Sequence, residues 1–196
     1  MAWKDVSIAQ YKKIAALETN EDWQWNALAI LNGTTYEDIL NRPLNETMAL
    51  SRDFNKWALN SPIIHPVKKK YEINGKTYEF MGYPDKISTA VYIDFYNTGR
   101  EIPKDITDML SLVLIPEGHK YNDGYDMDEV KDDIENHFNI EDALSVCDFF
   151  TSLSQVLLRQ ALRQAKKMLK KARKEGIPTQ GAEKLLKEYQ ATVGLK

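Results

Sequence analysis

Apolar and polar residues alternate with the period of an α-helix over the first part of the chain. Ser7 followed three residues later by Gln10 is typical of a capping box, in which each side chain satisfies a backbone amide at a helix start. Apolar spacing and capping residues predict further helices over residues 20–31 and 45–57, with a short one beginning at Thr35. The chain is therefore expected to open as a set of short helices.

The pattern changes to the two-residue period of a β-strand near residues 67–81. Alternating runs flank Asn74 and Gly75, a pair that readily adopts the left-handed conformation of a two-residue hairpin turn. An isolated hairpin is only marginally stable in water, so its apolar face must pack on helices or extend a partner's sheet. The residues expected to carry this hairpin contact are Tyr71, Ile73, Asn74, Gly75, Tyr78 and Phe80.

Helical periodicity returns after the hairpin. Ser88 is expected to open a helix that Gly99 ends, and Pro103 and Pro116 are expected to bound a second, strongly apolar helix. A loop that contains Gly, Asn and Asp follows. A further capping box predicts that the next helix begins at Asp126.

Residues 140–175 contain neither Pro nor Gly and predict one uninterrupted helix, about 50 Å long at about 1.5 Å per residue. Gly176 and Pro178 end it, and Thr179 is expected to cap a short terminal helix. The apolar stripe of the long helix changes from large residues to alanines, so its first half is expected in a core and its second half is expected to project or to approach another backbone. The stripe consists of Val146, Phe150, Leu153, Leu157, Ala161, Ala165, Met168 and Ala172.

Together these patterns predict a mainly α protein with one β-hairpin, of the α+β class. Residues 1–139 are expected to form a helical body that carries the hairpin. Residues 140–196 are expected to add the long basic helix and the short terminal helix, as one continuous structural unit with the body.

Composition narrows the kind of protein. With 196 residues and 43% hydrophobic content, the chain is long enough to bury a sizeable core. Its start does not have the pattern of a signal peptide, and no stretch has the roughly 18 apolar residues of a membrane helix, so no membrane partner is expected. A single cysteine, Cys147, is typical of a protein made in a reducing cytoplasm.

Residues that could carry catalysis or bind a metal are scattered. The histidines His65, His119 and His137 do not follow a zinc-binding spacing, and Cys147 has no histidine near it in the sequence. No glycine-rich phosphate loop can be drawn, and the acidic loop before Asp126 fails the pattern of a calcium-binding loop. The sequence therefore predicts no enzymatic activity, no metal and no cofactor.

Charge is divided unevenly along the chain, whose net charge is -3. Residues 159–196 hold 11 Lys and Arg against 3 Asp and Glu, whereas the rest of the chain holds 15 against 26. Such a basic end has three interpretations: a solvated helix face, an interface with the acidic region of a neighbour, or a nucleic-acid contact. The expected basic contact residues are Arg159, Arg163, Lys166, Lys167, Lys170 and Lys174.

The acidic counterpart lies within residues 117–142. Its expected contact residues are Asp126, Asp128, Asp132 and Asp133. Opposite poles on one chain favour head-to-tail packing of copies, which makes a ring if the rotation between copies closes. A homo-oligomer is therefore the preferred assembly, and nucleic acid is an alternative partner of the basic helix.

Two further segments carry a resemblance to known proteins. Residues 87–96 (ISTAVYIDFY) and 112–126 (LVLIPEGHKYNDGYD) resemble a family of small structural and assembly proteins of tailed bacteriophages, most like those of short-tailed, crAss-like phages of gut Bacteroides. The hairpin and the helical N-terminal segment fit the same layout. The resemblance covers roughly residues 1–155 and leaves out the basic C-terminal part.

The resemblance implies a structural protein of the virion, made in the cytoplasm of the host bacterium. It would form a ring or hub in the portal-to-tail region as a homo-oligomer, in contact with other phage structural proteins such as portal or tail components. A tail or scaffold assembly chaperone that is not retained in the virion is the alternative. A nucleic-acid-binding protein that uses the basic helix is the second alternative, and the family offers no catalytic residues to transfer.

Overall fold

The computed structural model describes residues 2–98, 104–121, 123–175 and 177–192. It is mostly helical with one small antiparallel sheet, which confirms the predicted α+β class. The chain divides into two compact units, Met1–Phe149 and Phe150–Lys196. The division falls within α8 (Ile140–Lys174), whereas the sequence pattern placed the end of the body before this helix.

The first unit opens with short helices, as the sequence predicts. They are the 3-10 turn η1 (Trp3–Asp5) and the helices α1 (Ile8–Ala15), α2 (Trp23–Asn32), α3 (Tyr36–Leu40) and α4 (Leu44–Ala58). The predicted capping box is present, because the Ser7 hydroxyl accepts a hydrogen bond from the Gln10 amide at 3.2 Å and the Gln10 side chain accepts one from the Ser7 amide at 3.0 Å. Gly33 follows α2 with a φ of 62°, a left-handed conformation that glycine adopts without steric cost.

A three-stranded antiparallel sheet contains the predicted hairpin. Its strands are β1 (Lys70–Ile73), β2 (Lys76–Phe80) and β3 (Leu114–Pro116), in the order β1-β2-β3. Asn74 and Gly75 form the turn between β1 and β2 with φ values of 50° and 72°, as the pair predicts. The hairpin prediction is therefore confirmed, and the third strand was not expected.

Strand β3 corrects the apolar helix that was predicted up to Pro116. Helix α6 spans Ile106–Ser111 only, and Ile115 pairs with Glu79 of β2. Leu114 and Ile115 are fully buried. A short apolar run of this kind suits a buried strand as well as a helix, and the backbone bonds of β2 decide for the strand.

The other described helices are α5 (Thr89–Thr98), α7 (Met127–His137), α8 and, after it, α9 (Gln180–Thr192). Asp126 caps α7, since its carboxylate accepts the Asp128 amide at 2.9 Å. The reciprocal half of the predicted capping box is not formed, because the Glu129 carboxylate pairs with Lys76. The expected helix stop at Gly99, helix start at Pro103 and break at Gly176 lie outside the described residues.

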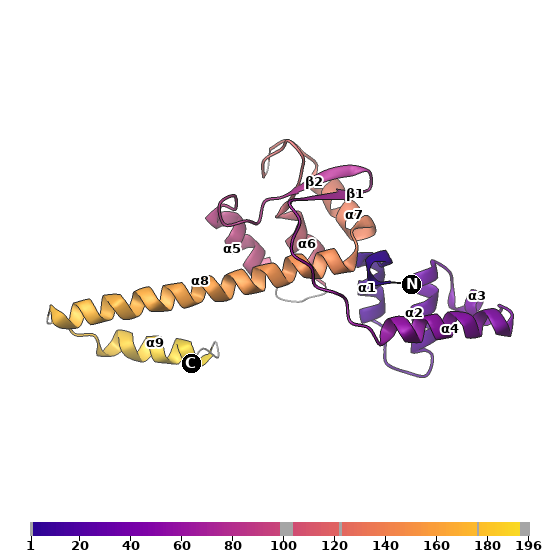
Figure 1. Cartoon of the computed structure of the whole chain (residues 1–196), viewed down its shortest axis with the longest axis horizontal. Helices are drawn as coiled ribbons and strands as arrows, with labels where there is room; N and C mark the ends of the chain where they lie inside the picture. The colour runs from indigo at the N-terminus through magenta and orange to yellow at the C-terminus, as the bar shows by residue number, and fades with distance from the viewer. Residues whose placement is uncertain (1, 99–103, 122, 176, 193–196) are drawn as a thin grey trace. The chain divides into compact units, whose positions relative to one another are not determined.

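The apolar face of the hairpin packs inside the first unit. Tyr71, Ile73, Tyr78 and Phe80 are all buried, which places them in the core rather than at a surface. The Tyr71 ring meets the Phe138 ring edge-on, with centroids 5.1 Å apart. Figure 1 shows the sheet beside α6 and α7, the helices that supply this cover. Of the two alternatives for the hairpin, packing on helices of the same chain is the one observed.

The first turns of α8 belong to the core of the first unit. Ile140 and Val146 are fully buried. The Ile140 amide donates a hydrogen bond to the Val6 carbonyl at 2.9 Å, and the His65 amide donates one to the Ser145 hydroxyl at 2.9 Å. These contacts bind the start of α8 to two distant segments, which explains why the unit ends within this helix.

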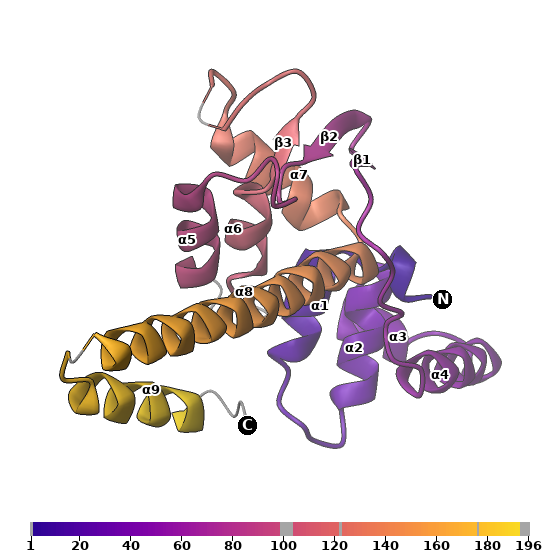
Figure 2. The ribbon, with the colours of Figure 1, turned by 60° about the vertical axis from the view of Figure 1, so that its left-hand side comes forward.

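The second unit consists of the rest of α8 and of α9, which lies alongside it in both views (Figures 1 and 2). Arg173 near the end of α8 forms an ion pair with Glu183 of α9. The more covered face of α8 here is not the stripe that the sequence predicts: Leu162 is 8% exposed, whereas Met168 is 73% exposed. Over residues 159–174 the more covered positions are Leu162, Ala165, Leu169 and Ala172, so the covered side overlaps the predicted stripe there only at Ala165 and Ala172.

Candidate functional site

The second unit presents a continuous row of cations, here called the basic face. It consists of Arg159, Arg163, Lys166, Lys167, Lys170 and Lys174 of α8, all of them exposed. Within the described part of the chain, none of these side chains forms an ion pair or a side-chain hydrogen bond. Many of them stand three or four residues apart, where like charges on a helix repel each other by a few tenths of a kcal/mol per pair.

The acidic side chains of the second unit do not compensate the basic face. Residues 150–196 contain three, Glu175, Glu183 and Glu188. Each pairs with a cation outside the basic face: Glu175 with Lys171 at 3.8 Å, Glu183 with Arg173, and Glu188 with Lys184 at 3.9 Å. The excess positive charge of this unit is therefore concentrated on one side of α8.

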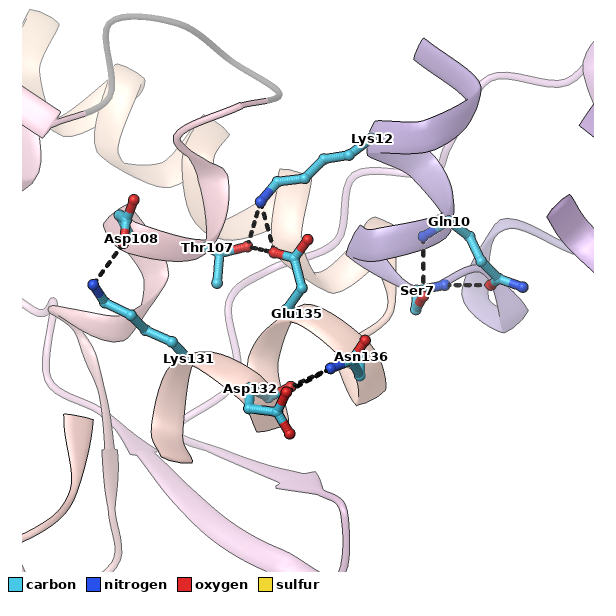
Figure 3. Close-up of polar contacts among 9 residues, drawn as sticks. All are labelled: Ser7, Gln10, Lys12, Thr107, Asp108, Lys131, Asp132, Glu135 and Asn136. Atoms are coloured by element: carbon cyan, nitrogen blue, oxygen red, sulfur yellow. Dashed lines mark hydrogen bonds and ion pairs between the residues drawn. The ribbon is translucent and has the colours of Figure 1, made fainter. Parts of the chain in front are cut away.

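A shallow polar groove lies on the first unit, between α1, α6 and α7 (Figure 3). Its volume is about 360 Å³, and it is here called the acidic groove. The side chains that line it are Lys12, Thr107, Asp108, Asp128, Lys131, Asp132 and Glu135. Four carboxylates thus face two ammonium groups.

Both lysines of the groove are already engaged. The Lys12 Nζ lies 2.6 Å from a Glu135 carboxylate oxygen and 2.9 Å from the Thr107 hydroxyl, which also bonds to Glu135 (Figure 3). Lys131 pairs with Asp108 at 2.8 Å. The groove therefore keeps two carboxylates in excess, and its two lysines tie α1 and α6 to α7.

The two carboxylates in excess are Asp128 and Asp132, which both lie exposed on α7. Neither forms an ion pair with a described residue, although Asp132 accepts a hydrogen bond from the Asn136 amide group at 2.8 Å (Figure 3). Asp126, the third predicted acidic residue, is exposed and is used as the helix cap. Asp126 and Asp128 thus lie at the start of α7 and Asp132 at its middle, and two of the four predicted acidic residues, Asp128 and Asp132, line the groove.

Asp133, the fourth, is not on this surface. It is 2% exposed and faces the hairpin, where its carboxylate accepts hydrogen bonds from the Tyr78 hydroxyl at 2.6 Å, the Asn74 amide group at 2.7 Å and the Lys76 ammonium at 2.7 Å. Burial opposes its ionisation, but these three donors outweigh burial and lower the pKa of Asp133 to about 2. Asp133 is a clamp between α7 and the hairpin, so it is not available to a partner.

The predicted hairpin contact is also internal for four of its six residues. Tyr71, Ile73, Tyr78 and Phe80 are buried, and the Asn74 side chain bonds to Asp133. Burial, followed by the bond to Asp133, raises the pKa of the Tyr78 hydroxyl, so this group stays protonated and keeps donating to the carboxylate. A contact through this apolar face is therefore corrected to a contact within the chain.

The described part of the chain does not bring together side chains suited to metal binding or to thiol chemistry. In the ranges that the structure describes, no group of three or more His, Cys, Asp and Glu side chains could hold a metal ion. Cys147 is buried, and burial raises the pKa of its thiol to about 12, which keeps it protonated.

None of the described helices is both long enough and apolar enough to cross a membrane.

No protein-family model, curated protein or solved structure matches the chain. The expected resemblance to phage proteins therefore stays a prediction from residues 87–96 and 112–126.

Sequence reasoning missed the lysines and the threonine that complete the groove. Lys12, Thr107 and Glu135 come from three helices far apart in the chain, and no local pattern joins them. The missed signal is the helix α7 itself: its apolar residues Val130 and Ile134 define the buried side, and the side that faces the groove carries Asp128, Lys131, Asp132 and Glu135.

Proposed function

We propose that the chain is a structural protein of a tailed-phage particle, a ring or adaptor of the portal-to-tail region that assembles as a homo-oligomer through the basic face of α8. The phage setting follows from the resemblance of residues 87–96 and 112–126. The observation that carries the assembly is the basic face, whose six cations have no counter-charge among the described residues.

Charge alone favours a protein partner with an acidic surface. The chain as a whole is acidic, with a pI of about 5.7, so each copy carries an anionic body as well as a cationic helix. The lysine-rich stretch from residue 159 to residue 175 contains no aromatic residue on which a base could stack. Copies of the chain therefore attract one another through opposite poles, and this attraction weakens as salt shortens its range.

The oligomeric mass of the purified protein across a salt series tests this proposal. At about 50 mM salt a multi-copy mass is expected, and at about 1 M salt, where the screening length is about 3 Å, a shift to smaller species. Replacing Arg159, Arg163, Lys166 and Lys170 with glutamate should remove the large species at low salt.

A matched control has the same change in net charge at exposed cations outside the basic face, Lys13, Arg52, Lys69 and Lys86. This control should assemble as the unchanged protein does. Normal assembly of the basic-face variant at low salt would contradict the proposal, as would equal loss in both variants.

Mass spectrometry of purified virions tests the place in the particle. A structural component should be present at a fixed copy number relative to the portal protein. Its absence from virions, together with its presence in infected cells, would overturn the ring or adaptor and leave the assembly chaperone.

Duplex DNA is the other anion that such a face could meet. Under the proposal, the full chain should not shift duplex DNA at about 50 mM salt, because the acidic body repels phosphate. A shift that disappears steeply with salt and with the basic-face variant would favour nucleic-acid binding instead.

A further inference from the structure

We infer that the occupant of the basic face is a second copy of this chain, which presents Asp128 and Asp132 of its acidic groove. The inference rests on the proposed function and specifies which anionic surface the helix meets. It selects two of the four aspartates that the sequence predicts as acidic contacts.

The selection follows from which carboxylates already have a cation. Close to the groove, Asp108 and Glu135 are paired with Lys131 and Lys12. On the opposite side of α7, Lys76 forms ion pairs with Glu129 and with Asp133, each at 2.7 Å. A partner cation gains less from a carboxylate that already has one.

The sheet side of the acidic segment is neutralised in the same way. Glu117 pairs with Lys70, and Asp142 pairs with Lys68 at 2.9 Å. The two groove carboxylates, by contrast, have no cation among the described residues. Asp123 and Asp126 likewise have no described cation, but the Asp126 carboxylate is engaged as the cap of α7 and Asp123 does not line the groove. Within the groove, Asp128 and Asp132 are therefore the positions where an incoming ammonium or guanidinium group gains most.

The two surfaces also match in spacing. Asp128 and Asp132 stand four residues apart on α7, which puts them one turn, or about 6 Å, from each other. The basic face repeats the same interval in Arg159 and Arg163 and again in Lys166 and Lys170. A helix that crosses the groove can thus place two consecutive cations against two consecutive carboxylates.

A second copy is the occupant that brings both surfaces in equal number. Each copy has one basic face and one acidic groove, so the contact is head-to-tail and leaves an unused pole at each end of a pair. Such a contact continues until it closes into a ring or extends as a filament. This agrees with a multi-copy assembly and requires no other component.

The experiment is a charge exchange between two full-length variants. The first is the basic-face variant, with Arg159, Arg163, Lys166 and Lys170 replaced by glutamate. The second carries Asp128→Lys and Asp132→Lys. Each alone should lose the multi-copy mass at low salt, because like charges then meet. An equimolar mixture should regain it, because each variant supplies the complement of the other.

A matched control for the acidic variant is Glu18→Lys with Asp53→Lys, two exposed carboxylates of the same unit outside the groove. It should assemble normally and should not complement the basic-face variant. Far-ultraviolet circular dichroism checks that each variant is folded. If the lysines at α7 unfold the protein, Asp128→Asn with Asp132→Asn replaces them and should reduce the assembled fraction several-fold.

The outcomes separate this inference from the proposed function. If the basic-face variant loses assembly while the acidic variant assembles normally, the assembly through α8 stands and the groove is not its partner. If the basic-face variant assembles normally, the proposed function itself fails. Loss in each variant without recovery in the mixture would also overturn the pairing, since it would mean that the two surfaces do not meet between copies.

Discussion

The two units of this protein differ in how their charged side chains are paired. In the first unit, lysines pair with carboxylates from distant segments: Lys12 with Glu135, and Lys68 with Asp142. In the second unit the ion pairs join residues only four to ten positions apart, and most cations of α8 have no partner among the described residues. Pairs that are partly buried and join distant segments hold a fold, whereas an exposed excess of one sign is suited to a partner.

The largest expected effect comes from the clamp of the first unit. Asp133→Ala removes the acceptor of three hydrogen bonds and leaves the Tyr78 hydroxyl buried without a partner. We expect a loss of about 3 kcal/mol in the free energy of unfolding, as for other broken buried networks. Urea unfolding followed by circular dichroism measures it.

The neighbouring substitution Asp132→Ala is the control for this prediction. Asp132 is exposed and has no ion pair with a described residue, so its removal should change stability by no more than about 0.5 kcal/mol. Similar losses in the two variants would mean that burial does not distinguish these adjacent carboxylates.

A smaller loss of stability is expected when the pH is lowered. Since the pKa of Asp133 is lowered to about 2, below its ordinary value of about 3.9, its contribution is complete above the ordinary value and is lost as the pH falls toward 2. The loss should amount to about 2.5 kcal/mol in the free energy of unfolding. Asp133→Asn should lower stability at pH 6 and should show a weaker decline between pH 5 and about pH 2.

The decline is measured by urea unfolding at several pH values in both proteins. Other carboxylates with lowered pKa, such as Asp38 and Glu183, titrate in both proteins, so the difference between the two curves isolates Asp133. If the free energy of unfolding falls with pH by the same amount in both proteins, ionisation of Asp133 does not stabilise the fold.

The smallest expected change in stability comes from removing one charge of the basic face. Lys170→Gln removes repulsion with Lys166 and Lys174, each four residues away, and should stabilise α8 by about 0.5 kcal/mol at low salt. Lys171→Gln removes the repulsion with Lys167 and Lys174 and also the attraction to Glu175, so its net gain should be smaller than that of Lys170→Gln. Thermal unfolding at low and high salt measures both, and a gain that persists at about 1 M salt would not be electrostatic.

Local features of the fold could be predicted from the sequence because their causes lie within a few residues. The capping box at Ser7 and Gln10, the Asn74-Gly75 turn and the long helix after residue 139 all have the form that their residues predict. Each depends on hydrogen bonds or backbone conformations that neighbouring residues supply.

Features that depend on distant segments were predicted incompletely. Leu114 and Ile115 suit a helix by local spacing, but β2 offers them backbone partners, and they form a strand. Asp132 and Asp133 are adjacent and chemically alike, yet one faces solvent and the other faces Tyr78. The direction of a side chain on a helix and the presence of a distant donor separate them, and neither is a property of the short sequence around them.

The sequence by itself determined the helical character of this protein, its hairpin turn and the separation of an acidic body from a basic end. These follow from hydrophobic period, turn chemistry and the count of charges, which are local or additive quantities. Only the tertiary structure decided where the body ends within α8, which strand completes the sheet and which carboxylates are left without a lysine. Those outcomes depend on contacts between residues far apart in the chain, because a charge is neutralised by whatever the fold brings within reach.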